Sequence, residues 1–202
     1  MNRRADIVGA ILAGGASSRM GADKARMPVN GIPMIAHVAG TLSQAFAEVI
    51  VLAGREARYP FLGLKHISDI FEECGPLGGI HAALVHASPN PVFVLACDMP
   101  FVPPALIDFM VSHRSQAKAN LASVDEKVQP LCGLYDSECR ETMESRLQKG
   151  RNSVLGALEE IDHSVISIGP NLPFYFPHIL GNVNNSEDYQ VTQKRASRDD
   201  AK

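Results

Sequence analysis

Short apolar runs alternate along this chain with segments that have the pattern of helices. This alternation is typical of a parallel β-sheet whose two faces are covered by helices. We therefore expect an α/β fold, specifically a single Rossmann-like three-layer α/β/α domain with a mainly parallel central sheet. The expected strands are Ile7–Ala13, Val49–Ala53, Leu64–Ile67, Val92–Cys97, Ala119–Val124, Leu131–Tyr135 and Ser164–Ile168. The expected helices are Pro33–Phe46, Pro76–His86, Pro104–Ser112, Ser137–Gln148, Ser153–Glu159 and Ser186–Lys194.

The composition is that of an ordinary folded domain. A chain of 202 residues with 46% hydrophobic and 20% charged side chains is long and apolar enough for one α/β domain with a full core. No linker rich in Gly, Pro or Ser divides it. We predict one domain over residues 1–196 and a frayed polar tail over residues 197–202.

The charge pattern excludes some classes of partner. The net charge is −3 and the cations are scattered, which argues against a broad nucleic-acid surface. No apolar segment approaches the roughly 20 residues that a bilayer span needs, and the N-terminus lacks the pattern of a secretory signal. The four cysteines include no C-x-x-C pair, so a zinc site has no support. We expect a cytoplasmic protein that binds neither nucleic acid nor membrane.

A glycine-rich stretch follows the first expected strand directly. It contains Gly14 and Gly15 and the cations Arg19 and Lys24. Glycines let backbone N–H groups approach an anion closely, and the cations add full charges. The stretch lacks the Walker A string, and the Gly14–Gly15 pair breaks the spacing of a dinucleotide fingerprint. It predicts a site for a nucleoside triphosphate, the alternative being a plain turn with solvated charges.

A second group of residues lies at the end of the expected strand Val92–Cys97. There Asp98 is followed by Met99 and Pro100. Ligands of open α/β sheets bind outside the carboxyl ends of the strands, so Asp98 is expected to face the same crevice as the glycine-rich stretch. One hard carboxylate suits Mg²⁺, which completes its shell with water and phosphate oxygens. The alternative is a turn or helix-capping aspartate.

A third group combines Asp69 with the segment Gly75-Pro76-Leu77-Gly78-Gly79-Ile80. Glycines at the start of a helix permit close approach to a ring or a ribose, and the helix N-terminus offers free N–H groups. Asp69 is suited to accept hydrogen bonds from a purine edge or a ribose. The alternative is a tight turn with a solvated aspartate.

Together these motifs resemble the signatures of molybdenum cofactor guanylyltransferases of the MobA type, within the nucleotidyltransferase superfamily. The resemblance rests on Leu12-Ala13-Gly14-Gly15-x-Ser17-x-Arg19-Met20-Gly21-x-Asp23-Lys24, on Gly75-Pro76-Leu77-x-Gly79, on Cys97-Asp98-Met99-Pro100 and on Asn182-Val183-Asn184-Asn185-Ser186-Glu187-Asp188. It covers the chain from Val8 to about Tyr189. One departure is Ala53-Gly54-Arg55, where the family has an asparagine.

The resemblance implies transfer of GMP from GTP to molybdenum-molybdopterin, with release of pyrophosphate and with Mg²⁺ as cofactor. It implies an N-terminal half that binds the nucleotide and a C-terminal half that binds the acceptor. Transient contacts with other molybdenum cofactor biosynthesis proteins and with acceptor apo-enzymes are also expected. The implied nucleotide-binding residues are Leu12, Ala13, Gly14, Gly15, Lys24, Asp69, Gly79 and Asp98. The expected catalytic residues are Arg19, Lys24 and Asp98, with Asp98 as the metal ligand, and the acceptor-binding candidates are Arg151, Asn182 and Asn184.

Two other readings stay open at this point. One is a molybdenum cofactor cytidylyltransferase or another small nucleotidyltransferase, because those relatives more often have alanine where this chain has Gly14, and a larger residue there would crowd a purine. The other is a non-catalytic accessory protein that binds the nucleotide or the cofactor. The joint presence of Arg19, Lys24 and Asp98 argues against it, since binding alone needs no metal ligand.

Overall fold

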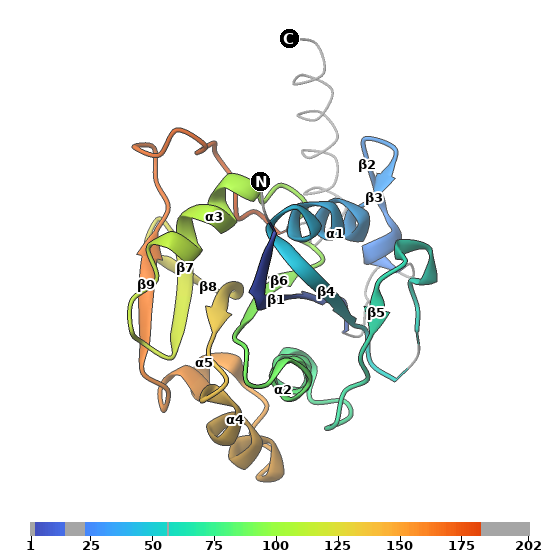
Figure 1. Ribbon diagram of the computed structural model, residues 1–202, viewed down its shortest axis with the longest axis vertical. Coiled ribbons are helices and arrows are strands. Elements are labelled where there is room, and N and C mark those ends of the chain that lie inside the picture. Colours follow the sequence, from blue (N-terminus) through green and yellow to red (C-terminus); the bar gives the residue numbers. More distant parts are fainter. Residues whose placement is uncertain (1–2, 15–22, 56, 183–202) are drawn as a thin grey trace.

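A seven-stranded sheet forms the centre of the protein (Figure 1). The computed structural model describes residues 3–14, 23–55 and 57–182. The strand order is β5-β4-β1-β6-β8-β7-β9, and β8 alone runs antiparallel to both of its neighbours. The predicted mainly parallel sheet is therefore confirmed. The strands are β1 (Arg4–Leu12), β4 (Phe46–Leu52), β5 (Lys65–His66), β6 (Val92–Ala96), β7 (Ala119–Val124), β8 (Lys127–Tyr135) and β9 (His163–Ser167).

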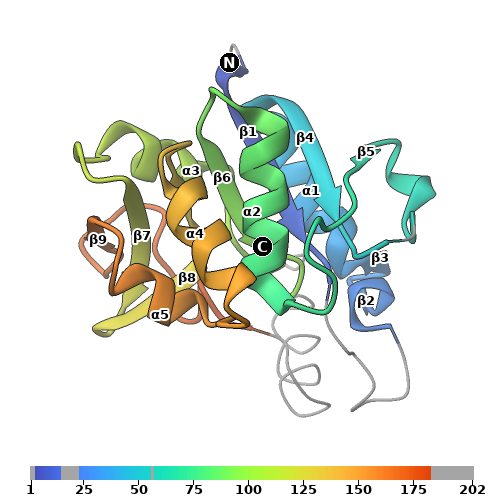
Figure 2. The ribbon, with the colours of Figure 1, turned by 90° about the horizontal axis from the view of Figure 1, so that it is seen from below.

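Helices cover both faces of the sheet, which gives the three layers that the sequence predicts (Figures 1 and 2). Side chains alternate across each strand, so β1 contributes Ile7 and Ile11 to one core and Val8 and Ala10 to the other. The first core lies under α1 (Met34–Ala45) and α3 (Pro104–Ser112), and the second lies under α2 (Gly75–Ala87), α4 (Cys139–Gln148) and α5 (Val154–Leu158).

None of the helices in the described part of the chain is long and apolar enough to cross a bilayer.

Strands β1, β4 and β8 are longer than predicted, and the extensions of β4 and β8 each have a local cause. Strand β4 begins at Phe46, because α1 passes directly into it and the Phe46 ring packs in the core 5.7 Å from that of Phe93. Strand β8 begins at Lys127, because a two-residue turn at Asp125 and Glu126 connects it to β7. Both turn residues have positive φ, 50° and 62°, which matches the twist of a tight hairpin.

Three small elements were not predicted. They are the hairpin of β2 (Pro28–Val29) and β3 (Ile32–Pro33) and the 3₁₀ helices η2 (Lys24–Arg26) and η3 (Pro60–Leu62). They are too short to produce a periodic pattern. The expected helix Ser186–Lys194 and the expected tail 197–202 lie outside the described residues.

The order of the strands places a crevice at the carboxyl end of β1. From β1 the chain passes through α1 to β4 on one side, and later through α2 to β6 on the other side. Ligands of open α/β sheets bind where the strand order reverses in this way. Two backbone hydrogen bonds fix this edge: Ala13 N–H donates to the Leu52 carbonyl over 2.8 Å, and Cys97 N–H donates to the Leu12 carbonyl over 3.0 Å.

Candidate functional site

A cavity of about 540 Å³ lies at this carboxyl edge. Its volume is in the range of small-molecule pockets. It brings together Gly14 from the end of β1 and Asp69 from the connection between β5 and α2, which the sequence placed in one nucleotide site. The complete lining is Gly14, Ala53, Gly54, Arg55, Arg58, Asp69, Glu72, Glu73 and Gly75.

Asp69 presents an acceptor that the described residues do not satisfy. Its Oδ1 atom is buried and has no hydrogen-bond partner among them. Burial raises the pKa of Asp69, and His66 lowers it in part. A Cβ built on Gly79 would lie 3.9 Å from this oxygen and 3.0 Å from Leu12 Cδ2, so a side chain at Gly79 would crowd both. Because buried acceptors in proteins nearly always have a donor, this oxygen marks a place where a ligand donor fits.

Asp98 presents a second such oxygen, beside a lysine. It lies in the turn after β6, separated from the strand by Cys97, and its Oδ1 is buried without a partner among the described residues. Burial raises the pKa of Asp98, whereas a backbone hydrogen bond and the positive charge of Lys24 lower it. Neither residue lines the cavity, so the candidate site has two parts: the cavity and the Lys24–Asp98 pair.

The single carboxylate of Asp98 fits a cation that takes most of its ligands from water and substrate. No group of three or more His, Cys, Asp and Glu side chains that could hold a metal exists among residues 3–14, 23–55 and 57–182. A single carboxylate with one free buried oxygen is what Mg²⁺ takes when phosphate oxygens complete its coordination. Asp98 therefore suits Mg²⁺ and does not suit a structural zinc ion.

The other residues that the sequence predicts for the site differ in burial and in their position relative to the cavity. Leu12 and Ala13 are buried at the end of β1. Arg151 is exposed in the turn after α4 and does not line the cavity, whereas Asn182 has a buried Oδ1 without a partner among the described residues. Gly15, Arg19 and Asn184 lie outside the described residues.

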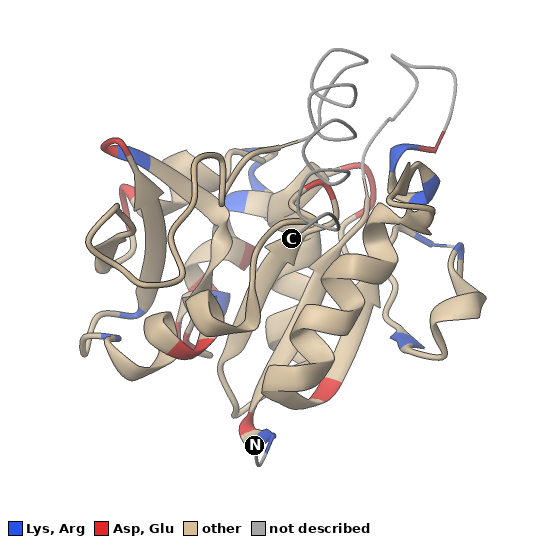
Figure 3. Ribbon diagram, turned by 90° about the horizontal axis from the view of Figure 1, so that it is seen from above, with Lys and Arg blue, Asp and Glu red and all other residues tan. Residues whose placement is uncertain are grey.

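Several charged residues around the cavity were missed by sequence reasoning. Arg58, Glu72 and Glu73 line it, and Arg55 and Glu72 form an ion pair at its wall. The position of Arg55 and Arg58 in the chain could have identified them. Their segment follows the carboxyl end of β4, as the glycine-rich stretch follows β1. Figure 3 shows that basic and acidic positions are spread over many elements.

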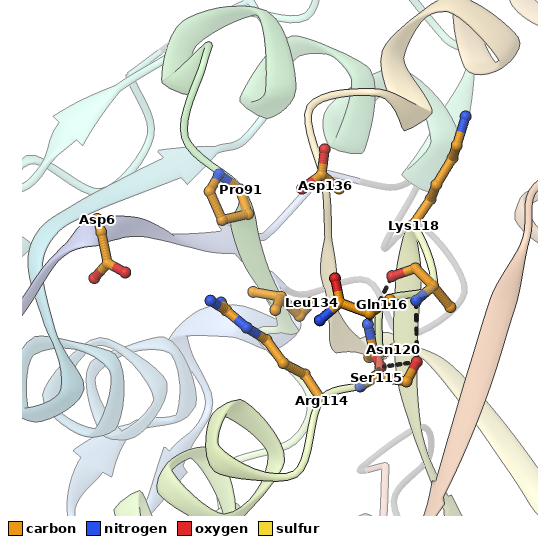
Figure 4. A pocket seen from close by; sticks show the side chains of 10 residues that line it. Asp6, Pro91, Arg114, Ser115, Gln116, Lys118, Asn120, Leu134 and Asp136 are labelled. Carbon is orange, nitrogen blue, oxygen red and sulfur yellow. Dashed lines mark hydrogen bonds between the residues drawn. The ribbon is translucent and has the colours of Figure 1, made fainter.

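A second cavity, of about 370 Å³, lies at the opposite, amino edge of the sheet (Figure 4). Its central polar residue, Asn120, is only 3% exposed. The Asn120 Oδ1 atom accepts hydrogen bonds from Ser115 N–H at 2.8 Å, Ser115 Oγ at 3.0 Å and Ser164 Oγ at 2.7 Å. The Asn120 Nδ2 group donates to the Ala117 carbonyl over 3.0 Å. These bonds fasten the loop before β7, and both polar atoms of the Asn120 amide are hydrogen-bonded within the protein.

The fold and the carboxyl-edge site define a nucleotide-binding α/β protein. Comparison with known families identifies the family to which this chain belongs. The profile described as the MobA-like NTP transferase domain matches residues 9–162. This chain belongs to the family of MobA-like NTP transferases and is a nucleotidyltransferase, as its motifs predict.

Individual relatives agree with this assignment. A protein of Pelotomaculum thermopropionicum named probable molybdenum cofactor guanylyltransferase is 40% identical over 147 residues, which cover 73% of this chain and 72% of the relative. A protein of the same name from Clostridium perfringens is 32% identical over 190 residues, covering 92% of this chain and 96% of the relative. The crystal structure of molybdopterin-guanine dinucleotide biosynthesis protein A from Archaeoglobus fulgidus has the same fold. Its TM-score is 0.82 at 24% identity, and the match covers 95% of this chain and 99% of that one.

Proposed function

We propose that this protein transfers GMP from GTP to molybdenum-molybdopterin, forming the guanine dinucleotide cofactor and releasing pyrophosphate. The observation that carries the proposal is that Asp69 and Asp98, around the end of β1, each bury a carboxylate oxygen that has no hydrogen-bond partner among the described residues. One is suited to the hydrogen-bond donors of a guanosine, and the other to a metal ion on its phosphates. The names of the relatives support the choice of substrates.

The guanosine is assigned to the cavity. Asp69 accepts hydrogen bonds from the base or the ribose, and we assign Leu12, Ala13, Gly15 and Gly79 to the same nucleoside. Gly14 carries the preference for a purine. Among the described residues nothing requires glycine there, because its backbone has no positive φ and the nearest described atom to an added Cβ would be Gly54 N at 3.7 Å, an ordinary contact. The described part of the protein would therefore tolerate a methyl group at this position, and we assign the space that it would fill to the ligand.

The phosphates are assigned to the second part of the site. Asp98 would hold Mg²⁺, and Lys24 and Arg19 would hold phosphate oxygens. When bound, Mg²⁺ supplies positive charge that balances the triphosphate and the departing pyrophosphate. Lys24 and Arg19 orient the triphosphate and stabilise the same charge from their side.

The reaction needs charge control more than proton transfer. The acceptor is a phosphate monoester, whose oxygen is already a nucleophile at neutral pH. That oxygen forms a bond to the α-phosphorus of GTP while the bond from the α-phosphorus to the bridging oxygen breaks, and the electron pair leaves with pyrophosphate. The main barrier is repulsion between two anions, which Lys24 and Arg19 reduce. No general base is required of this chain.

The acceptor is assigned to the C-terminal half of a single domain over residues 1–196. Arg151 would supply a cation, and Asn182 and Asn184 would supply amide groups. The Oδ1 of Asn182 is buried and has no partner among residues 3–14, 23–55 and 57–182, which supports a ligand contact at that residue.

The test is pyrophosphate release by the purified protein with GTP, CTP, ATP or UTP, each with and without molybdopterin loaded with molybdenum. We expect release with GTP only, and only when the acceptor is present. Release with CTP instead would replace the proposal by a cytidylyltransferase. GTP binding without release under any of these conditions would identify an accessory protein.

A further inference from the structure

A buried tyrosine outside the recognised motifs holds the residue that precedes Lys24. Tyr59 is only 5% exposed. Its hydroxyl group lies within hydrogen-bond distance of both carboxylate oxygens of Asp23, 3.0 Å from Oδ1 and 3.1 Å from Oδ2. Arg58 Nη2 donates to Asp23 Oδ2 over 3.3 Å. Two consecutive residues between β4 and η3 therefore fasten one carboxylate that lies 35 and 36 positions earlier in the chain.

Arg26 closes this cluster from the other side. Its guanidinium lies 5.7 Å from the centre of the Tyr59 ring and 5.6 Å from that of Phe61. Its Nη2 also donates to the Arg58 carbonyl over 2.6 Å. The distances from the Arg26 guanidinium to the two ring centres are ones at which a cation is attracted to an aromatic face. We call the group Asp23, Arg26, Arg58 and Tyr59 the η2 clamp, because it ties η2 to the segment before η3.

The clamp acts on the local geometry of Lys24. Asp23 is the N-cap of η2, and its Oδ1 accepts a hydrogen bond from Ala25 N–H over 3.2 Å. Lys24 is the first residue of η2 and lies between the cap and the capped N–H. Fixing the Asp23 carboxylate therefore fixes the backbone from which the Lys24 side chain extends.

We propose that Tyr59, supported by Arg58, is a positioning residue that holds Lys24 in place for the triphosphate. The clamp itself follows from the contacts above, whereas the benefit to catalysis rests on the proposed function. Tyr59 takes no part in proton transfer: burial, and then the charge of Asp23, raise the pKa of its hydroxyl group, which stays a hydrogen-bond donor at neutral pH. Tyr59 does not line the cavity, so a direct contact with the base is not invoked.

The first experiment measures the clamp without any substrate. Tyr59→Phe removes the hydroxyl group and keeps the ring. Because the change removes a hydrogen bond to a charged partner, amide exchange over residues 24–27 should become at least about tenfold faster. Tyr135→Phe is the matched control, because it also removes a buried hydroxyl, one that donates to the Pro130 carbonyl over 2.6 Å. Equal exchange over 24–27 in Tyr59→Phe and the unmodified protein would overturn the clamp.

The second experiment measures its effect on catalysis. We expect Tyr59→Phe to lower kcat about tenfold while KM for GTP stays within about twofold, because a displaced Lys24 loses contact mainly in the transition state. In a Lys24→Ala background the same change should have no further effect. Independent, multiplying effects of the two changes would overturn the positioning role. Inactivity of the unmodified chain with GTP would overturn the proposed function instead, and the exchange measurement would still decide on the clamp.

Discussion

The two cavities at opposite edges of the sheet differ in what their buried polar atoms do. At the amino edge, Asn120 makes four hydrogen bonds to the loop before β7 and to β9. At the carboxyl edge, Asp69 and, nearby, Asp98 each bury an oxygen that has no partner among the described residues. A buried polar atom without a partner costs free energy, so it persists where a ligand provides the missing contact. Cavity volume alone does not separate the two edges, whereas hydrogen-bond satisfaction does.

The largest expected effect is a loss of turnover caused by substitutions at the carboxyl edge. Asp98→Ala and Lys24→Ala should each lower kcat by on the order of 10²-fold or more, because each removes an electrostatic partner of the transition state. The measurement is the steady-state rate of pyrophosphate release. Near-normal GMP transfer by either folded variant would refute the assignment of these two residues.

The next effect concerns the choice of nucleotide. Gly14→Ala should raise KM for GTP about tenfold and affect CTP less, because in the proposed site the added methyl group would meet the base, while the nearest described protein atom lies at an ordinary 3.7 Å. Gly40→Ala in α1 is the control, since an added Cβ there meets no atom within 4 Å and glycine is a poor helix former. An unchanged ratio of GTP to CTP activity in Gly14→Ala would remove position 14 from base selection.

At the amino edge the same kind of change should affect stability and leave activity intact. Asn120→Ala should lower the free energy of unfolding by about 2 kcal/mol, because the groups that it bonds lose their partner, while kcat/KM stays within about twofold. Urea denaturation gives the first quantity. Ser164→Ala removes one of the bonds to Asn120 and should cost about 1 kcal/mol. A loss of GMP transfer with Asn120→Ala would show that this edge also has a functional role.

The smallest effect is a pH-dependent gain in stability. Burial raises the pKa of Asp69 in the folded protein, so the folded state binds more protons than the unfolded state between the ordinary and the raised pKa. The free-energy cost of burying the charged Asp69 carboxylate is fully present above the raised pKa. It disappears as the pH falls toward the ordinary pKa of an aspartate. Asp69→Asn should therefore raise the melting temperature of the free protein at pH 7, while weakening GTP binding.

Melting curves of Asp69→Asn and the unmodified protein across this pH range test the argument. The two melting temperatures should converge as the pH falls. A difference that is constant with pH would contradict a charge penalty at Asp69.

Residue patterns predicted the strands and part of the site, because both have a local signal. An apolar run such as Val92–Cys97 predicts a buried strand, and the position after it predicts that Asp98 reaches the ligand edge. The contact of Tyr59 with Asp23 had no such signal. It joins a loop to a three-residue turn, and nothing in the spacing of the two residues relates them. Asn120 was missed for a similar reason, since its partners Ser115 and Ser164 come together only when β7 pairs with β9.

The reversed direction of β8 has a practical consequence for engineering. It turns the β7–β8 connection into a two-residue hairpin, with Val124 paired to Lys127, at the same sheet edge as the end of β6. Hairpin tips are the places where chains best accept insertions. A fluorophore or a short affinity loop placed between Asp125 and Glu126 would therefore sit on the ligand side of the molecule without cutting a helix. The one strand that departs from the parallel pattern thus offers an attachment point for a reporter of substrate arrival.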